Sequence, residues 1–150
     1  LNPRREKLVA AISSIASHLD IIILNKDEAR QITGNQDLHA QCKAFRNLGI
    51  KTIAITDGRR GSHVYHGDVL YATLPAKVKV VETTGAGDAF ASAFCAGMLM
   101  KDDPIFALKL GMIQAESVIQ GKGARKILLS KPAALKKLAN DHRAIEKTRL

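Results

Sequence analysis

The stretch Glu82-Thr83-Thr84-Gly85-Ala86-Gly87-Asp88-Ala89-Phe90 connects an expected strand to an expected helix. Residues 78–84 are rich in β-branched side chains, which predicts a strand, and residues 89–101 are small and apolar, which predicts a buried helix. A helix N-terminus presents unpaired backbone N–H groups and the positive end of the helix dipole. Gly85, Ala86 and Gly87 therefore predict an anion hole at this turn, beside an ionised Asp88 that is placed to accept the proton of an attacking hydroxyl. The alternative from the residues alone is a simple strand-to-helix turn with an Asp cap.

The rest of the chain alternates helical and strand patterns on both sides of this stretch. The expected helices are Glu6–His18, a short helix opened by Asn25-Lys26-Asp27-Glu28 and closed by Gly34, Asp37–Leu48, Pro104–Gln120 and a last helix opened by Ser130-Lys131-Pro132. The expected strands are 19–24, 51–56, 62–66 and 69–74. The run 19–24 is apolar on both faces, as in a buried parallel strand. We therefore expect an α/β fold, with a layered parallel sheet, flanking helices and a small antiparallel portion.

The composition is that of a globular domain. The chain has 150 residues, of which 46% are hydrophobic and 25% charged, which argues against disorder. The longest charge-poor run, 89–100, is far shorter than the roughly 20 residues that a membrane span requires, so no membrane association is expected. Cys42 and Cys95 have no paired spacing, which argues against a disulfide scaffold and a zinc cage and fits a reducing, cytoplasmic environment.

The net charge of +9 is concentrated in the segment from Lys122 to Leu150. The basic residues there are Lys122, Arg125, Lys126, Lys131, Lys136, Lys137, Arg143, Lys147 and Arg149, and only Asp141 and Glu146 oppose them. No aromatic side chain is interleaved with these charges, so the stacking platforms typical of nucleic-acid binding are missing. We expect a solvated helical face rather than a nucleic-acid site.

Four segments together resemble one known family. Thr83–Phe90 resembles the carboxy-terminal signature of the ribokinase-like (PfkB) family of carbohydrate and nucleoside kinases. Asn25–Glu28 resembles the family's N-x-x-E motif, and Thr56–Gly61 resembles its nucleotide-facing T-x-G-x-x-G turn. Leu1-Asn2-Pro3 resembles the strand end that precedes this region in ribokinases. The four motifs occur in the family's order across residues 1 to about 130.

The resemblance implies ATP-dependent transfer of a phosphoryl group to a hydroxyl of a sugar or sugar derivative. It implies that Asp88 is the catalytic base and that the backbone of Gly85, Ala86 and Gly87 holds the transferring group. Asn25 and Glu28 would organise Mg²⁺ and the nucleotide phosphates. Thr56, Gly58 and Gly61 would line the ATP pocket.

One family feature is altered at residue 82. Glu82 stands where the family usually has Asp, at a position tied to a potassium site in several members. After Gly123-Ala124, the sequence Arg125-Lys126-Ile127 replaces a serine that the family often places near the same cation. Both departures argue against K⁺ activation. A monovalent cation near Glu82 and Thr84 is therefore a weaker expectation than the ATP and Mg²⁺ sites.

Family members are about twice as long as this chain, or two ordinary domain lengths. We therefore expect residues 1–150 to be the carboxy-terminal nucleotide-binding and catalytic part, without the amino-terminal half and its lid. The isolated chain should be weakly active or inactive, and should form a homo-oligomer through an exposed sheet edge. The alternatives are a nucleoside kinase fragment and a non-catalytic module that binds a nucleotide or a partner.

Overall fold

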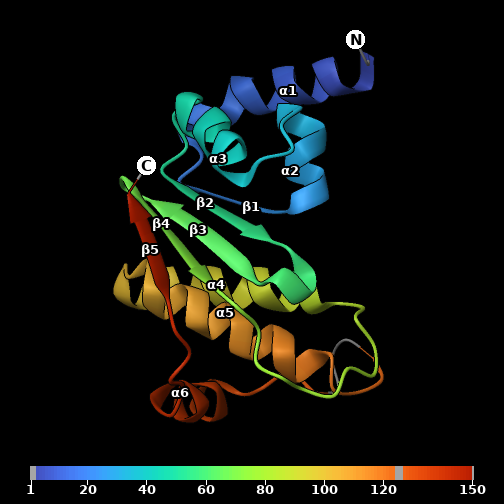
Figure 1. Cartoon of the computed structure of the whole chain (residues 1–150), viewed down its shortest axis with the longest axis vertical. Helices are drawn as coiled ribbons and strands as arrows, with labels where there is room; N and C mark the ends of the chain where they lie inside the picture. The colour runs from blue at the N-terminus through green and yellow to red at the C-terminus, as the bar shows by residue number, and fades with distance from the viewer. Residues whose placement is uncertain (1–2, 124–126, 150) are drawn as a thin grey trace. The chain divides into compact units, whose positions relative to one another are not determined.

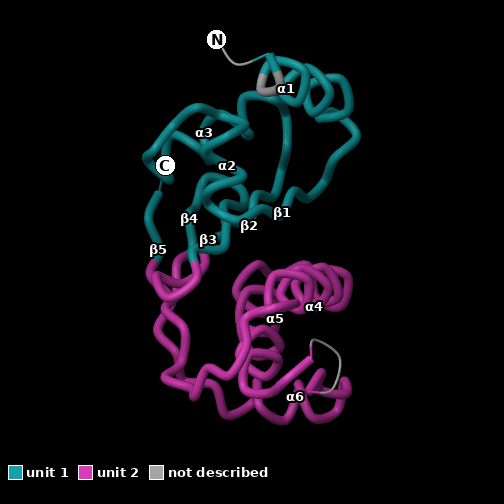
Figure 2. The backbone as a smooth tube through the Cα atoms, turned by 90° about the vertical axis from the view of Figure 1, so that its right-hand side faces the viewer, with its two compact units in different colours: residues 1–57, 63–71, 147–150 teal, residues 58–62, 72–146 magenta. Residues whose placement is uncertain are grey.

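A computed structural model describes residues 3–123 and 127–149. By its internal contacts the chain divides into two compact units, shown in Figure 2. Unit 1 comprises residues 1–57, 63–71 and 147–150, and unit 2 comprises residues 58–62 and 72–146.

Most of a five-stranded sheet belongs to unit 1 (Figure 1). Its strands are β1 (Ile21–Asn25), β2 (Thr52–Thr56), β3 (Ser62–His66), β4 (Val69–Thr73) and β5 (Glu146–Arg149), and they lie in the order β1-β2-β3-β4-β5. Strands β1 and β2 are parallel, with Ile21 opposite Thr52 and Asn25 opposite Thr56. A two-residue turn joins β3 to β4, which makes them an antiparallel hairpin. The expected α/β architecture with an antiparallel portion is confirmed.

The helices of unit 1 that follow β1 begin and end at residues that the sequence marks, whereas the helix before β1 begins at Pro3 and not at the expected Glu6. They are α1 (Pro3–Ile15), the 3₁₀ turn η1 (Ala16–His18), α2 (Lys26–Thr33) and α3 (Leu38–Asn47). Gly34 ends α2 with a left-handed φ of 75°, and the Asp37 carboxylate caps α3 by accepting from Ala40 N at 2.8 Å. The core of the unit is formed by Ala16, Ala29, Ile32, Cys42, Phe45, Ile50, Ile53, Ile55, Tyr65 and Leu70. Burial raises the pKa of the Cys42 thiol to about 12, so this cysteine is a core residue rather than a ligand.

Unit 2 is built on α4 (Ala86–Lys101) and α5 (Pro104–Val118), with α6 (Lys131–Ala139) and the 3₁₀ turn η2 (Gly58–Arg60). Small residues let α4 and α5 approach closely. A Cβ built on Gly97 would lie 2.7 Å from Ala107 Cα, and one on Gly111 would lie 2.9 Å from the Phe90 ring. The Asp103 carboxylate caps α5, directly before Pro104.

The expected strand at 78–84 is wrong. The structure has an irregular segment from residue 74 to the turn at Thr84 and Gly85. The amides of Val81 and Glu82 donate to Ile119 O, at 2.7 and 3.3 Å, and not to a neighbouring strand. The β-branched residues in 78–84 therefore lie in a loop that packs against the end of α5.

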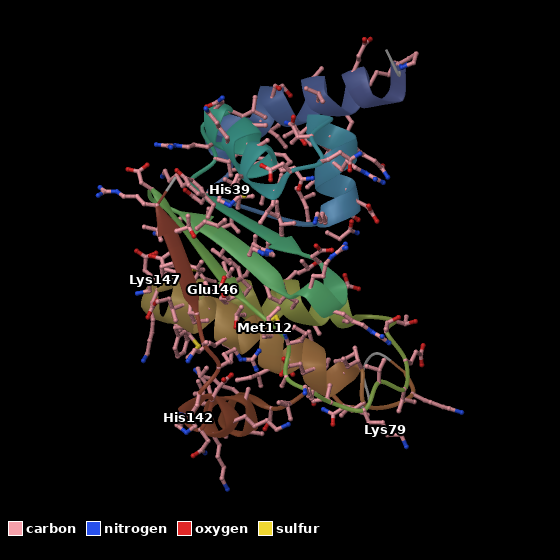
Figure 3. The ribbon with its side chains drawn as sticks, viewed as in Figure 1. His39, Lys79, Met112, His142, Glu146 and Lys147 are labelled. Atoms are coloured by element: carbon pink, nitrogen blue, oxygen red, sulfur yellow. The ribbon has the colours of Figure 1, made fainter. Side chains whose placement is uncertain are left out.

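The basic segment is only partly the solvated helical face that we expected. Residues 146–149 form strand β5, where Glu146 and Lys147 are labelled in Figure 3. Arg143 is nearly buried and pairs with Glu116 and Asp141. Arg125 and Lys126 lie outside the described residues, as do Leu1 and Asn2, whereas Pro3 begins α1 rather than ending a strand. Within the described part of the chain, no helix is long and apolar enough to cross a membrane.

Candidate functional site

The first turn of α4 leaves backbone donors unused. Gly85 precedes the helix with a left-handed φ of 82° and provides no side-chain cap. Ala86 N donates to Thr83 O at 3.2 Å, whereas the amides of Gly87 and Asp88 have no protein acceptor among the described residues. A Cβ on Gly87 would meet nothing within 4 Å. This turn therefore offers free N–H groups and open space beside the exposed Asp88 carboxylate, which is the geometry of an anion site.

Glu82 fixes the loop that leads into this turn. Its Oε2 accepts from Gly123 N at 3.0 Å, and its carboxylate also accepts from the Thr84 hydroxyl. These two hydrogen bonds, the first being the stronger influence, lower the pKa of Glu82 below its usual range. These contacts bring Glu82 and Thr84 together and tie two loops to each other. The cation site expected near these two residues stays a prediction.

A buried ionic network braces the start of the same loop. Both Nη atoms of Arg143 donate to the Glu116 carboxylate at 2.9 Å, and Arg143 Nε donates to Asp141 Oδ2 at 2.6 Å. The Arg143 and Glu116 side chains are only 11% and 10% exposed. Glu116 Oε1 also accepts from Ala76 N at 2.8 Å. Sequence reasoning missed this network, and its only signal was the single carboxylate of helix α5.

In unit 1, the N-x-x-E residues bond to each other. Asn25 Oδ1 accepts from Glu28 N, and Glu28 Oε2 accepts from Asn25 N, both at 2.8 Å. This is a capping box at the start of α2. It leaves Asn25 Nδ2 and Glu28 Oε1 without a partner among the described residues.

The parallel register places Thr56 beside Asn25, at the carboxyl ends of β1 and β2. Ligands of open α/β sheets bind at this end of the strands. The next residues along each strand, Lys26 and Asp57, form an ion pair at 2.9 Å in which the Asp57 side chain is only 10% exposed. The structure therefore brings Asn25, Glu28 and Thr56 together.

Gly58 and Gly61 bracket the turn after β2. Both have positive φ, at 55° and 95°, and Gly61 N donates to Gly58 O at 3.1 Å. A Cβ on Gly61 would lie 2.0 Å from Thr73 O. Position 61 therefore requires glycine, because the backbone of Thr73 lies too close to leave room for a side chain.

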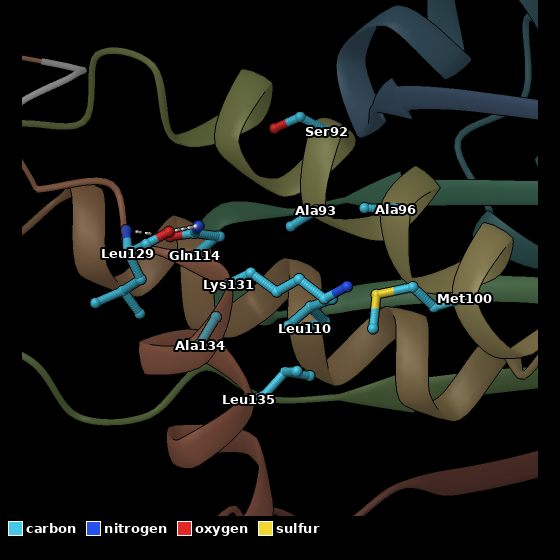
Figure 4. A pocket seen from close by; sticks show the side chains of 10 residues that line it. All are labelled: Ser92, Ala93, Ala96, Met100, Leu110, Gln114, Leu129, Lys131, Ala134 and Leu135. Carbon is cyan, nitrogen blue, oxygen red and sulfur yellow. Dashed lines mark hydrogen bonds between the residues drawn. The ribbon is translucent and has the colours of Figure 1, made fainter.

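A cavity of about 240 Å³ lies elsewhere in unit 2 (Figure 4). It is lined by Ser92, Ala93, Ala96, Met100, Leu110, Gln114, Leu129, Lys131, Ala134 and Leu135. Gln114 exchanges hydrogen bonds with the backbone of Leu129, and Ser92 donates to Asp88 O at 2.8 Å. None of the predicted site residues lines this cavity.

The donor set fits a metal that is bound mainly by phosphate oxygens. Within residues 3–123 and 127–149, no group of three or more His, Cys, Asp or Glu side chains could hold a metal ion. Mg²⁺ is usually bound through one or two carboxylates, waters and substrate phosphates. Glu28 in unit 1 and Asp88 in unit 2 each have an exposed carboxylate of the kind that Mg²⁺ uses as a ligand.

Comparison with known proteins identifies the family. The model of the pfkB family carbohydrate kinases matches residues 1–131. The chain belongs to the pfkB family. This pfkB chain is 33% identical over 114 residues to cytidine kinase of Thermococcus kodakarensis, covering 75% of the chain and 41% of that protein. It is 34% identical over 113 residues to ATP-dependent 6-phosphofructokinase of Thermoanaerobacterium thermosaccharolyticum, covering 75% of the chain and 35% of that protein.

Solved structures of pfkB-type kinases share the fold. Arabidopsis thaliana ribokinase in complex with ribose and ATP superposes with a TM-score of 0.70 at 26% identity, over 84% of the chain and 43% of that structure. Fructokinase of Vibrio cholerae with fructose, ADP and calcium superposes with a TM-score of 0.77 at 23% identity, over 89% of the chain and 45% of that structure. The chain therefore has the ribokinase-like fold in incomplete form, and it spans less than half the length of these relatives.

Proposed function

We propose that the protein transfers the γ-phosphoryl group of ATP to a hydroxyl group of a sugar or sugar derivative. In this proposal residues 1–150 are the carboxy-terminal nucleotide-binding and catalytic part of the kinase. The observation that carries it is the first turn of α4, where the free amides of Gly87 and Asp88 adjoin the Asp88 carboxylate. Family membership supports this proposal, as do the ATP- and sugar-bound states of the related structures.

The chemistry follows from these groups. The Asp88 carboxylate accepts the proton of the acceptor hydroxyl while its oxygen forms a bond to the γ-phosphorus. The bond from that phosphorus to the bridging oxygen breaks, and ADP leaves with the electron pair. The amides of Gly85, Gly87 and Asp88 stabilise the negative charge on the moving group, which is the dominant contribution in phosphoryl transfer. The amide of Ala86, which the sequence also predicted for this role, already donates to Thr83 O.

Asn25, Glu28, Thr56, Gly58 and Gly61 are assigned to nucleotide binding. Mg²⁺, when bound, neutralises charge on the β- and γ-phosphates. The free Oε1 of Glu28 and Nδ2 of Asn25 would orient its waters and the phosphates without breaking the capping box. An E. coli protein assigned as ribokinase II was solved with ATP and Mg²⁺ and shares the fold, with a TM-score of 0.79 at 18% identity, over 91% of the chain and 44% of that structure.

A nucleoside acceptor is the second candidate. Cytidine kinase of T. kodakarensis is among the relatives with more than 30% identity, so a pyrimidine nucleoside belongs in any substrate panel. A non-catalytic nucleotide- or partner-binding module is the third candidate. It predicts binding of MgATP without transfer to any acceptor, even in the full-length protein.

Calorimetric titration with MgATP tests the phosphate site. Gly87→Val should weaken binding by roughly 10- to 100-fold, because the branched side chain covers amides whose charge-assisted hydrogen bonds are each worth about 1.5–3 kcal/mol. Asp88→Asn should preserve binding and reduce any transfer by about 10²–10⁴-fold. Ala96→Val, at an exposed position on the same helix, is the matched control and should bind like the parent.

One outcome would contradict the proposed phosphate site, and another would contradict the expected weak activity of the isolated chain. If Gly87→Val binds MgATP as tightly as the parent, the phosphate does not lie at this turn. If the isolated chain transfers phosphate to a sugar at an ordinary kinase rate that Asp88→Asn abolishes, the expectation that this part is weakly active or inactive alone is wrong.

A further inference from the structure

Two lysine–aspartate pairs connect the residues that flank β1 and β2, one pair at each end of the strands. At the amino ends, Lys51 Nζ lies 3.2 Å from Asp20 Oδ1, and the two side chains are 77% and 82% exposed. At the carboxyl ends, Lys26 Nζ lies 2.9 Å from Asp57 Oδ2, and the two side chains are only 32% and 10% exposed. Water and salt screen an exposed pair, whereas a shielded pair keeps its charges closely coupled. Asp57 therefore fixes the Lys26 ammonium group, and the amino-end pair is a natural reference for it.

The Lys26 ammonium group lies beside both segments of unit 1 that we assign to nucleotide binding. Lys26 is the first residue of α2 and directly follows Asn25. Its partner Asp57 directly follows Thr56, the last residue of β2. Since Asn25 lies opposite Thr56 in the sheet, the ion pair lies at the ends of the strands where the phosphates are expected.

The Lys26 ammonium group can bind a second acceptor. It carries three N–H donors, and one of them is donated to Asp57 Oδ2. No other acceptor for this group is found within residues 3–123 and 127–149. Lysine binds phosphate as a point charge and does not need a fixed donor geometry. Lys26 can therefore keep its bond to Asp57 and donate to a phosphate oxygen at the same time.

The carboxylates of these segments make a cation useful to an incoming phosphate. Asp27 and Glu28 lie in the first turn of α2, where Asp27 pairs with Arg30 at 3.2 Å. Asp57 adds a third carboxylate. Carboxylates repel a polyphosphate chain unless nearby cations offset them. Lys26 supplies positive charge at this place and leaves Glu28 in its capping box.

We propose that Lys26 is a further nucleotide-binding residue, whose ammonium group contacts the polyphosphate chain of MgATP while Asp57 positions it. Lys26 and Asp57 occupy variable positions of the N-x-x-E and T-x-G-x-x-G motifs, so neither motif accounts for their charges. This inference rests on the proposed function only because it takes MgATP as the ligand, and it requires no phosphoryl transfer.

Calorimetric titration of the whole chain with MgATP and with adenosine tests this contact. Lys26→Met should weaken MgATP binding by roughly tenfold, because it removes a hydrogen bond between charged groups. Binding of adenosine, which has no phosphate, should not change. Lys26→Arg keeps the positive charge and should bind MgATP within about threefold of the parent.

Lys51→Met is the matched control. It removes the same charge from the exposed pair at the other end of β1 and β2, and should bind MgATP like the parent. Circular dichroism and thermal melting establish that the variants are folded.

The outcomes separate this inference from the proposed function. If Lys26→Met binds MgATP as tightly as the parent while Gly87→Val has lost binding, the Lys26 contact is wrong and the phosphate site at α4 stands. An equal loss of MgATP and adenosine binding also overturns the contact, because Lys26 would then support the fold of the pocket. An equal effect of Lys51→Met overturns it as well, because net charge would then be the cause. A folded parent chain that binds no MgATP overturns the phosphate site and this contact together.

Discussion

The start of α2 and the loop before α4 both hold predicted site residues, but by different means. Asn25 and Glu28 fix each other across three positions of the sequence. The loop before α4 is held by Gly123, which lies 41 positions from Glu82, and by the Arg143–Glu116 pair, which contacts the loop at Ala76. Part of the candidate site is thus prepared locally, whereas the rest depends on partners that only the folded unit provides.

The largest loss of stability should come from removing the ion pairs that Arg143 makes with Glu116 and Asp141. Arg143→Met leaves Glu116 and Asp141 nearly buried without their cation, which we expect to lower the free energy of unfolding by about 3–5 kcal/mol. Urea denaturation measures this loss. Lys136→Met, on the exposed face of α6, is the matched control and should change stability by less than about 0.5 kcal/mol.

The double variant Glu116→Gln with Arg143→Met sharpens this interpretation. If the loss in Arg143→Met arises from an uncompensated Glu116 charge, the double variant should recover part of it. Equal stability of the single and double variants would show that the Arg143 side chain stabilises the unit by packing alone.

The local cap should matter less. Asn25→Ala removes the side-chain acceptor for Glu28 N and should cost about 1 kcal/mol of stability. Asn25→Asp keeps a good N-cap acceptor and should lie close to the parent. If Asn25→Ala lowered the free energy of unfolding as much as Arg143→Met, the local cap and the distant ion pairs would contribute equally. The contrast drawn between the two regions would then be wrong.

The smallest effect should come from titrating Glu82. Because the hydrogen bonds from Gly123 N and Thr84 lower its pKa in the folded state, they stabilise the fold fully above the ordinary Glu pKa. This contribution is lost as the pH falls through the lowered pKa. The amide resonance of Gly123 should therefore shift with a midpoint below 4.5. The same titration of Glu82→Gln should lack that transition, and a midpoint at or above 4.5 in the parent would contradict the assigned hydrogen bonds.

The contrast between local and distant contacts also explains which features could be predicted from the sequence. The capping box, the Gly34 stop and the Asp37 cap were predictable because each depends on residues within a few positions. The segment 78–84 was wrongly expected to be a strand because its β-branched pattern says nothing about whether a neighbouring strand is available. The buried state of Arg143 could not be predicted, since its partner Glu116 is 27 positions away and basic residues are usually solvated.

The proposed anion site at α4 lies between these cases. Its glycines and Asp88 were identified from the local motif, and the structure adds that two amides of the first turn have no protein acceptor among the described residues. The beginning of the helix at Ala86 was three residues earlier than expected, because Gly85 adopts the left-handed conformation that lets the turn close.

The contact between Gly97 and Ala107 limits which sequences can keep this fold. The space for a Cβ at position 97 is already taken by the backbone of α5 at Ala107, and backbone cannot move aside as a flexible side chain can. A saturation library at position 97, selected for folded chains, should return glycine almost exclusively. The same library at the exposed neighbour Ala96 should accept most residue types, so two adjacent codons would differ sharply in the variation that they tolerate.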